Sequence, residues 1–145
     1  MTRVWIIPVV LVLSGSFLAA SQGAEGAVGA SVALLAVFVL LAGVYSPLPF
    51  PPSTDTAEAR RRSAADGGPI VFWRPGCTYC LRLRLRLGRS ARRVHWVDIW
   101  RDPAGAAVVR EANGGDETVP TVVVAGRPYV NPDPRWVRGQ LPPSS

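Results

Sequence analysis

The chain has 145 residues and a net charge of +6, and 48% of its residues are hydrophobic while 18% are charged. This length allows one small soluble domain at most, and the long apolar runs exclude a disordered or fibrous chain. Two cysteines are too few for a disulfide-rich secreted domain. All sixteen basic residues are arginine, but no nucleic-acid-binding motif accompanies them, so we expect no nucleic-acid partner.

Two apolar stretches, residues 4–20 and 27–45, begin the chain, and Glu25 is the one charged side chain between residues 4 and 45. As helices they would each extend about 25–28 Å, close to the hydrocarbon thickness of a bilayer. Their short polar connector, residues 21–26, predicts a helical hairpin. Two pairs of small residues, Gly15 with Ala19 and Gly29 with Ala33, predict close packing between the helices. Residues 1–45 are therefore expected to form a membrane anchor.

A cleaved signal peptide is the alternative for the first stretch, because the small residues 19–21 lie near its end. We favour two spans, since Arg3 alone precedes the apolar run and cleavage would leave few residues before the second helix. Arg3 and the cluster 60–62 would then both be cytoplasmic, as the positive-inside rule requires. The expected location is the inner (plasma) membrane, multi-pass, with the C-terminal domain facing the cytoplasm.

A linker is expected over residues 46–68. Its first part, SPLPFPP at 46–52, cannot continue a helix and predicts a stiff extended spacer. Residues 54–65 predict either a short helix capped by Thr54 or Asp55, or a disordered segment. Gly67 and Gly68 mark the boundary of a domain over residues 69–138, and residues 139–145 form a tail.

Strands and helices alternate regularly in residues 69–138. One segment, Leu81 to Leu87, alternates leucine and arginine like a half-buried strand, but both residue types favour a helix and none is β-branched. Asp102 followed by Pro103 predicts the start of a helix. The expected strands are 70–74, 94–99, 121–125 and 128–130, and the expected helices are 77–87, 103–113 and one that begins near Pro132 or Asp133. The order β-α-β-α-β-β-α predicts an α/β domain of thioredoxin-like fold.

The C-x-x-C motif of Cys77, Thr78, Tyr79 and Cys80 lies between the first expected strand and helix. A cysteine at a helix N-terminus is stabilised as a thiolate by free N–H groups and the helix dipole, which makes Cys77 the expected nucleophile. Cys80, one turn further along, is close enough to form a disulfide with it. Arg74 would add positive potential. We expect thiol–disulfide chemistry here.

Other uses of the two cysteines fit less well. Zinc needs four ligands, and the chain offers two cysteines and one distant histidine, His95. Attachment of c-type haem would need a histidine after Cys80, where Leu81 stands. A structural disulfide would close a negligible loop and would be rare in a reducing compartment. We expect no metal and no bound cofactor, and we interpret His95 as a packing or surface residue.

Thr118, Val119 and Pro120 precede the third expected strand, a position that suits a cis-proline. With this motif, residues 69–137 resemble a glutaredoxin-type domain, and most of all the actinobacterial mycoredoxins. The similar segments are C-T-Y-C-L-R-L at 77–83, V-D-I at 97–99, N-G-G-D-E-T-V-P-T-V at 113–122 and N-P at 131–132.

The resemblance implies reduction of mixed disulfides between client proteins and a low-molecular-weight thiol, which in this family is mycothiol. Cys77 would attack the mixed disulfide, and a second mycothiol or Cys80 would resolve the intermediate. Pro120 would face the cysteines, Val119 would bind the thiol through its backbone, and Arg74, Thr78, Tyr79 and Thr118 would complete the site. The expected partners are this thiol, the membrane and the client proteins.

Two departures from the family pattern concern the site. Gly76 precedes Cys77 where the family often has an aromatic residue, and Asn131-Pro132-Asp133 replaces the two glycines and aspartate typical of glutathione users. Three alternative functions remain open: a dithiol reductase supplied by a flavoprotein, a non-catalytic C-x-x-C module that binds a metal or a partner, and an outward-facing oxidant. The arginines at 82, 84, 86, 89, 92 and 93 suggest a solvated face, or a docking surface for anionic lipid or an acidic protein.

Overall fold

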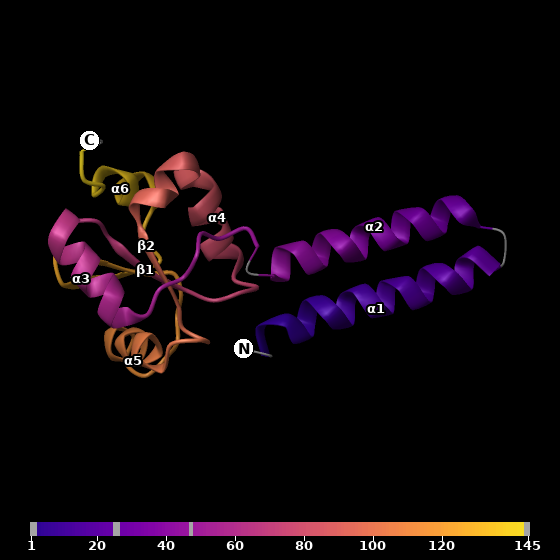
Figure 1. Cartoon of the computed structure of the whole chain (residues 1–145), viewed down its shortest axis with the longest axis horizontal. Coiled ribbons are helices and arrows are strands. Elements are labelled where there is room, and N and C mark those ends of the chain that lie inside the picture. Colours follow the sequence, from indigo (N-terminus) through magenta and orange to yellow (C-terminus); the bar gives the residue numbers. More distant parts are fainter. Residues whose placement is uncertain (1–2, 25–26, 47, 144–145) are drawn as a thin grey trace. The chain divides into compact units, whose positions relative to one another are not determined.

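The computed structural model describes residues 3–24, 27–46 and 48–143. The chain divides into two compact units, Met1–Pro49 and Phe50–Ser145, whose elements are labelled in Figure 1. Each unit has its own internal packing and is described by itself.

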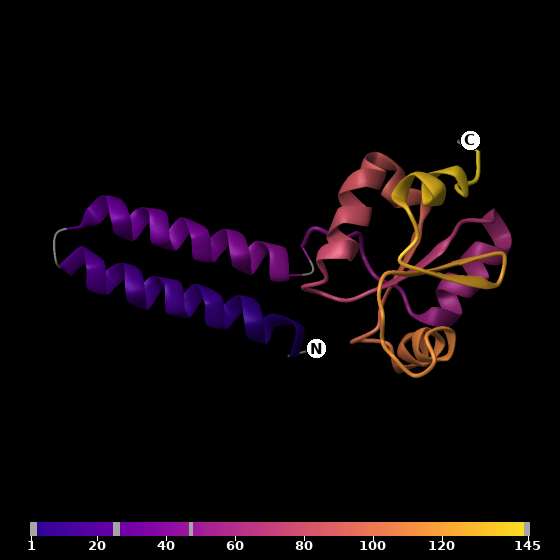
Figure 2. The ribbon, with the colours of Figure 1, turned by 180° about the vertical axis from the view of Figure 1, so that it is seen from behind.

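The first unit is a pair of helices, α1 (Arg3–Ala24) and α2 (Val28–Tyr45), which lie side by side in both views (Figures 1 and 2). The helices approach closely at Gly15, where a Cβ atom would lie 2.5 Å from the Cβ of Phe38. At Gly29, by contrast, nothing lies within 4 Å of such an atom. The helical hairpin is therefore confirmed, but only the first of the two small-residue pairs contributes a glycine to the contact.

Apolar side chains cover the outer surface of this hairpin. Leu13, Phe17 and Leu40 are 65%, 75% and 69% exposed. By length and composition, Trp5–Gly23 and Val28–Tyr45 could each cross a membrane. A surface this apolar is stable in lipid and costly in water.

The second unit contains one sheet and the helices that cover it. Its elements in chain order are α3 (Thr56–Asp66), β1 (Ile70–Trp73), α4 (Thr78–Leu87), the 3₁₀ helix η1 (Gly88–Arg93), β2 (His95–Asp98), α5 (Pro103–Ala112), β3 (Thr121–Val124), β4 (Arg127–Val130) and α6 (Pro134–Gly139). The four strands have the order β2-β1-β3-β4. Strand β1 pairs parallel with β2 and antiparallel with β3, and β3 forms a hairpin with β4. The thioredoxin-like α/β fold expected from the sequence is confirmed.

Helices cover both faces of this sheet, with α3 and α5 on one side and α4 and α6 on the other (Figures 1 and 2). Because side chains alternate along a strand, Ile70 and Phe72 face the first pair of helices, while Val71 and Trp73 face the second. All four residues of β1 are at most 3% exposed. The central strand is therefore apolar along its whole length, and residues 74–77 lead from it to α4.

The segment before α3 belongs to the second unit and differs from the linker expected over residues 46–68. Phe50 stacks on Trp73 with ring centroids 3.8 Å apart. The Ser53 hydroxyl accepts a hydrogen bond from the Asp98 N–H at 2.7 Å. The same hydroxyl donates a hydrogen bond to the Trp96 carbonyl at 3.1 Å. Thr54 donates its N–H to the same carbonyl at 3.0 Å. These contacts satisfy the open edge of β2, so most of the expected linker is part of the folded unit.

Helix α3 is capped by Asp55, the second of the two caps that the sequence suggested, and its Ala59 is fully buried. Its first residue, Thr56, donates its backbone N–H at 2.7 Å to the Asp102 carboxylate, which also accepts the N–H of Ala104 and so caps α5. The disordered alternative for residues 54–65 is therefore wrong, because one carboxylate joins the starts of two helices.

The leucine–arginine alternation before Gly88 forms helix α4, as expected from residue propensity. Leu83 and Leu87 are each 1% exposed and lie on the buried face with Cys80, while Leu85 is 67% exposed. A helix places residues four apart on one face, so two of the four leucines enter the core and Leu85 does not. The period-two pattern is therefore not that of a strand.

Candidate functional site

Cys77 lies at the point where β1 leads into α4, and it is the N-cap residue of that helix. Its sulfur accepts a hydrogen bond from the backbone N–H of Cys80 at 3.1 Å. Gly76, directly before it, has a φ of +76°, a conformation that side chains rarely adopt. This backbone conformation gives a structural reason for the glycine directly before Cys77.

Cys77 and Cys80 form a disulfide, and their Cα atoms are 5.2 Å apart. Cys77 is half-buried, whereas Cys80 is fully buried on the core face of α4. A reagent or substrate that approaches from solvent can therefore reach the sulfur of Cys77 but not that of Cys80. The N–H of Cys80 and the free N-terminal end of the helix are also placed to stabilise negative charge on the Cys77 sulfur.

The loop before β3 lies against the same sulfur. The carbonyl oxygen of Val119 is 3.4 Å from the Cys77 sulfur, and the Val119–Pro120 peptide bond is cis, as the sequence predicts. The Thr121 hydroxyl donates to the Thr118 carbonyl at 2.8 Å, and the Asn113 amide donates to that hydroxyl. The structure thus brings Val119 and Pro120 to the cysteines and holds their loop by polar contacts.

The other predicted site residues are Arg74, Thr78, Tyr79 and Thr118. The Arg74 carbonyl accepts the N–H of Cys77 at 3.4 Å, and its side chain is half-buried. Thr78 and Tyr79 begin α4 and are exposed, Tyr79 by 57%. Thr118 is exposed and acts through its carbonyl in the turn described above. These four residues border the site without touching the sulfur in the contacts that the structure shows.

Sequence reasoning did not place Arg82 in the site, and it considered Asn131 and Asp133 only as a departure from the pattern of glutathione users. With Tyr79 they line a groove of about 240 Å³ beside the start of α4. Asn131 has a φ of +44°, which is uncommon for a residue other than glycine, and its N–H bonds the Pro120 carbonyl at 2.8 Å. Their proximity to Tyr79 depends on how the end of β4 packs beside α4, which no local sequence pattern reveals.

Asp98 is a buried carboxyl group at the C-terminal end of β2. It pairs with Trp73 in the β1–β2 ladder and is 1% exposed. Burial raises its pKa above the ordinary value of 3.8, although the Trp100 N–H and the Arg101 guanidinium both act to lower it. One of its oxygens accepts the Trp100 N–H at 3.0 Å, and the other lies 3.5 Å from Arg101 Nε.

His95 lies at the opposite end of β2. Its Nε2 is 3.0 Å from the Asp66 carboxylate at the end of α3, so it links these two elements. Among the residues that the structure describes, no group of three or more His, Cys, Asp or Glu side chains is placed to hold a metal ion. His95 therefore has a structural contact and no contact with the cysteines in the described part of the chain.

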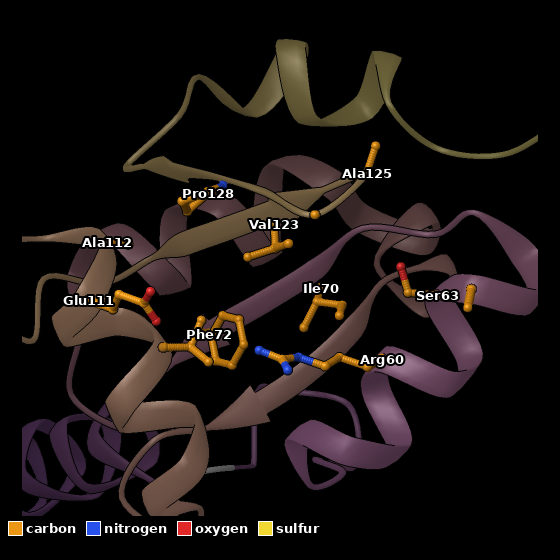
Figure 3. A pocket seen from close by; sticks show the side chains of 12 residues that line it. Arg60, Ser63, Ile70, Phe72, Glu111, Ala112, Val123, Ala125 and Pro128 are labelled. Atoms are coloured by element: carbon orange, nitrogen blue, oxygen red, sulfur yellow. The ribbon is translucent and has the colours of Figure 1, made fainter.

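A cavity of about 730 Å³ lies apart from the cysteines, neither of which lines it. Figure 3 shows Arg60 of α3 and Glu111 of α5 at its borders, with Ile70, Phe72 and Val123 of the sheet between them. It lies on the face of the sheet that α3 and α5 cover, whereas Cys80 packs on the α4 side. The cavity does not contribute to the thiol site.

The sequence model of the glutaredoxin family matches residues 70–129, which include both cysteines and the cis-proline. Two curated relatives from Mycobacterium tuberculosis, named "Putative glutaredoxin MT3292" (strain CDC 1551) and "Putative glutaredoxin Rv3198A" (strain H37Rv), are each 41% identical to the chain over 72 residues. The match covers 49% of the chain and 86% of each relative. With the fold and the C-x-x-C geometry described above, this shows that the chain belongs to the glutaredoxin family.

Proposed function

We propose that the protein is a membrane-anchored thiol–disulfide oxidoreductase that reduces protein disulfides or protein–mycothiol mixed disulfides through Cys77. Membership of the glutaredoxin family supports thiol oxidoreductase chemistry in general. The observation that carries the assignment to Cys77 is its position as the half-buried N-cap of α4, where its sulfur accepts the Cys80 N–H. The resemblance to mycoredoxins supports mycothiol as the co-substrate.

In the first step the Cys77 thiolate attacks the mycothiol sulfur of a mixed disulfide. A disulfide between Cys77 and mycothiol forms, and the client cysteine leaves as a thiolate that takes a proton from water. In the second step the thiolate of another mycothiol attacks the bound mycothiol sulfur, which releases mycothiol disulfide and restores the Cys77 thiolate. The low-molecular-weight thiol is therefore the reductant, and one free mycothiol is oxidised for each client cysteine that is reduced.

Cys80 offers a second way to release mycothiol from the Cys77 intermediate. Its thiolate can attack the Cys77 sulfur, which releases mycothiol and leaves the Cys77–Cys80 disulfide that the structure contains. This disulfide also favours a second candidate function, that of a dithiol reductase regenerated by a flavoprotein. The two functions differ in whether Cys80 is essential.

Turnover of a peptide–mycothiol mixed disulfide by the full chain in detergent micelles or nanodiscs tests the proposal. We expect activity in the wild type, loss to the level without protein in Cys77→Ser, and retained activity in Cys80→Ser. The same peptide carrying glutathione tests whether mycothiol is preferred. Activity that persists in Cys77→Ser would refute the role of Cys77, and equal loss in both variants would support the dithiol reductase instead.

The membrane location is part of the proposal and is supported by the two apolar helices of the first unit. With both helices spanning, Arg3 and the arginines at 60–62 lie on the same side, and the positive-inside rule makes this side cytoplasmic. The tether would raise the effective concentration of the enzyme near membrane-bound clients without changing its chemistry.

A further inference from the structure

Four arginines border a groove between α4 and α6. Arg82 and Arg86 are one turn apart on α4, and Arg135 and Arg138 are one turn apart on α6. The groove has a volume of about 130 Å³, and Asp133 and Pro134 complete its lining. All four arginines are exposed. We call this feature the arginine groove.

The positive charge of the arginine groove is largely uncompensated. Asp133 brings a carboxylate to the groove, but this carboxylate accepts the N–H of Arg135 at 2.7 Å and so caps α6. Arg138 donates to the backbone carbonyl of Arg86, which is a neutral acceptor. Within the described residues, none of the four arginines forms an ion pair with a carboxylate. Like charges gathered in this way repel one another and attract an anionic ligand.

The arginine groove shares lining residues with the groove beside the start of α4. Arg82 lines both, and Tyr79 and Asp133 border the one next to the start of α4. Arg82 is five residues beyond Cys77, which corresponds to about 7.5 Å along the helix axis, and Arg86 is about one further turn away. An extended peptide covers such distances with roughly two to four residues.

We propose that the arginine groove binds an acidic segment of the client protein, so that preferred clients carry Asp or Glu two to four residues from the reactive cysteine. The inference rests on the proposed function, because the client cysteine must first be placed at Cys77. A guanidinium matches a carboxylate with two parallel hydrogen bonds. A concave groove that leads along α4 from the end capped by Cys77 fits an extended peptide better than it fits the flat surface of a membrane.

Two peptide–mycothiol mixed disulfides of equal length test this proposal, one with Glu and the other with Gln at the third and fourth residues from cysteine. For the full chain in nanodiscs of neutral lipid, we expect kcat/KM for the Glu peptide to be about fivefold higher, since two exposed ion pairs have modest energies. The advantage should appear in KM and decrease with added salt. Turnover of the Gln peptide reports on the proposed function independently.

The double variant Arg82→Gln/Arg86→Gln should bring the ratio of the two kcat/KM values close to one, and Arg82→Lys/Arg86→Lys should keep most of the preference. The matched control is Arg60→Gln/Arg127→Gln, which removes two exposed arginines outside the groove and should leave the ratio unchanged. Equal kcat/KM for both peptides in the wild type would overturn the proposal, as would a preference that survives in Arg82→Gln/Arg86→Gln.

A membrane is the competing occupant. If the two peptides are equivalent, and if turnover instead depends on phosphatidylglycerol in the nanodisc and loses that dependence in Arg82→Gln/Arg86→Gln, the groove binds anionic lipid and the peptide proposal is wrong. If neither peptide is turned over through Cys77, the proposed function itself fails.

Discussion

The two sulfurs of the C-x-x-C motif lie three residues apart but in different environments. Cys77 is half-buried at the start of α4 and accepts the Cys80 N–H, whereas Cys80 is packed in the core with Leu83. Exposure and a hydrogen-bond donor both favour attack by Cys77, and burial restricts Cys80 to an intramolecular reaction with its neighbour. The division of roles inferred from the sequence therefore has a geometric basis.

Asp98 is expected to make the folded state less stable as the pH rises. Burial raises its pKa in the folded state above the ordinary value of 3.8, so the folded protein binds the proton more tightly than the unfolded chain. The contribution of this proton to stability is complete below 3.8 and is lost as the pH rises through the raised pKa. Asp98→Asn removes this titration and keeps an oxygen for the Trp100 N–H.

Urea unfolding of the wild type and Asp98→Asn over the range from acidic to neutral pH measures the effect. The free energy of unfolding of Asp98→Asn, minus that of the wild type, should increase with pH. Comparing the two proteins cancels the titration of the other carboxyl groups. A difference that stays constant, or that becomes smaller as the pH rises, would contradict the role of burial.

Local patterns were sufficient to predict where two residues of the candidate site lie. A cysteine after a strand and before a helix predicts the N-cap position of Cys77, and proline before a strand predicts the cis bond at Pro120. Arg82, Asn131 and Asp133 were not predicted as neighbours of Tyr79. They come together through the packing of α6 and the end of β4 beside α4, which depends on contacts between distant segments.

At the scale of the element, α4 is a helix although its leucines and arginines alternate with the period of a strand, because residue propensity and packing outweigh that alternation. Alternate leucines match a strand pattern, but a helix that begins at Cys77 buries Leu83 and Leu87 and exposes Leu85. The three arginines between the leucines are tolerated because one face of a helix is enough to form the core contact. The position of each leucine around the helix, rather than the alternation, determines which leucines are buried.

Two leucine variants test this phase directly. Leu83→Ala should lower the free energy of unfolding by about 3 kcal/mol, because it leaves a cavity in the core. Leu85→Ala is the matched control and should change that free energy by less than about 0.5 kcal/mol, because its side chain is exposed. Urea denaturation of both variants gives the comparison. Equal losses, as expected for leucines on one face of a strand, would contradict the helix.

The segment from Phe50 to Thr54 is the element that the sequence described least well. Prolines at 47, 49, 51 and 52 are typical of an extended spacer, and the backbone before α3 is indeed not helical. Local composition does not reveal that Phe50 stacks on Trp73 or that Ser53 bonds to β2. Such contacts join residues more than twenty positions apart, so they appear only once the sheet is formed.

At the scale of the whole molecule, the chain joins an apolar helical hairpin to a small α/β unit with its own core. The amino-acid sequence predicts this division because the charged residues are nearly absent from the first part. It does not predict where the folded unit begins, since the boundary at Phe50 depends on the contacts with Trp73 and β2.

The membrane topology can be measured with two reporters fused in turn to the C-terminus in a bacterial host. A fluorescent protein should be fluorescent and alkaline phosphatase inactive, because the first folds in the cytoplasm and the second requires export. The chain should remain in the membrane fraction, and removal of residues 1–45 should release it. Active phosphatase with a dark fluorescent protein would place the domain outside and would support an oxidant.

The central claim, that Cys77 is the attacking thiol, is tested most directly by alkylation of the reduced full chain with limiting iodoacetamide near neutral pH, followed by mass mapping of the modified cysteine. The account predicts that Cys77 is modified first and that Cys80 stays unmodified while the protein is folded. In denaturant, which removes the helix and the core, both cysteines should react at similar rates. Faster modification of Cys80 in the folded protein, or equal modification of both, would contradict the account.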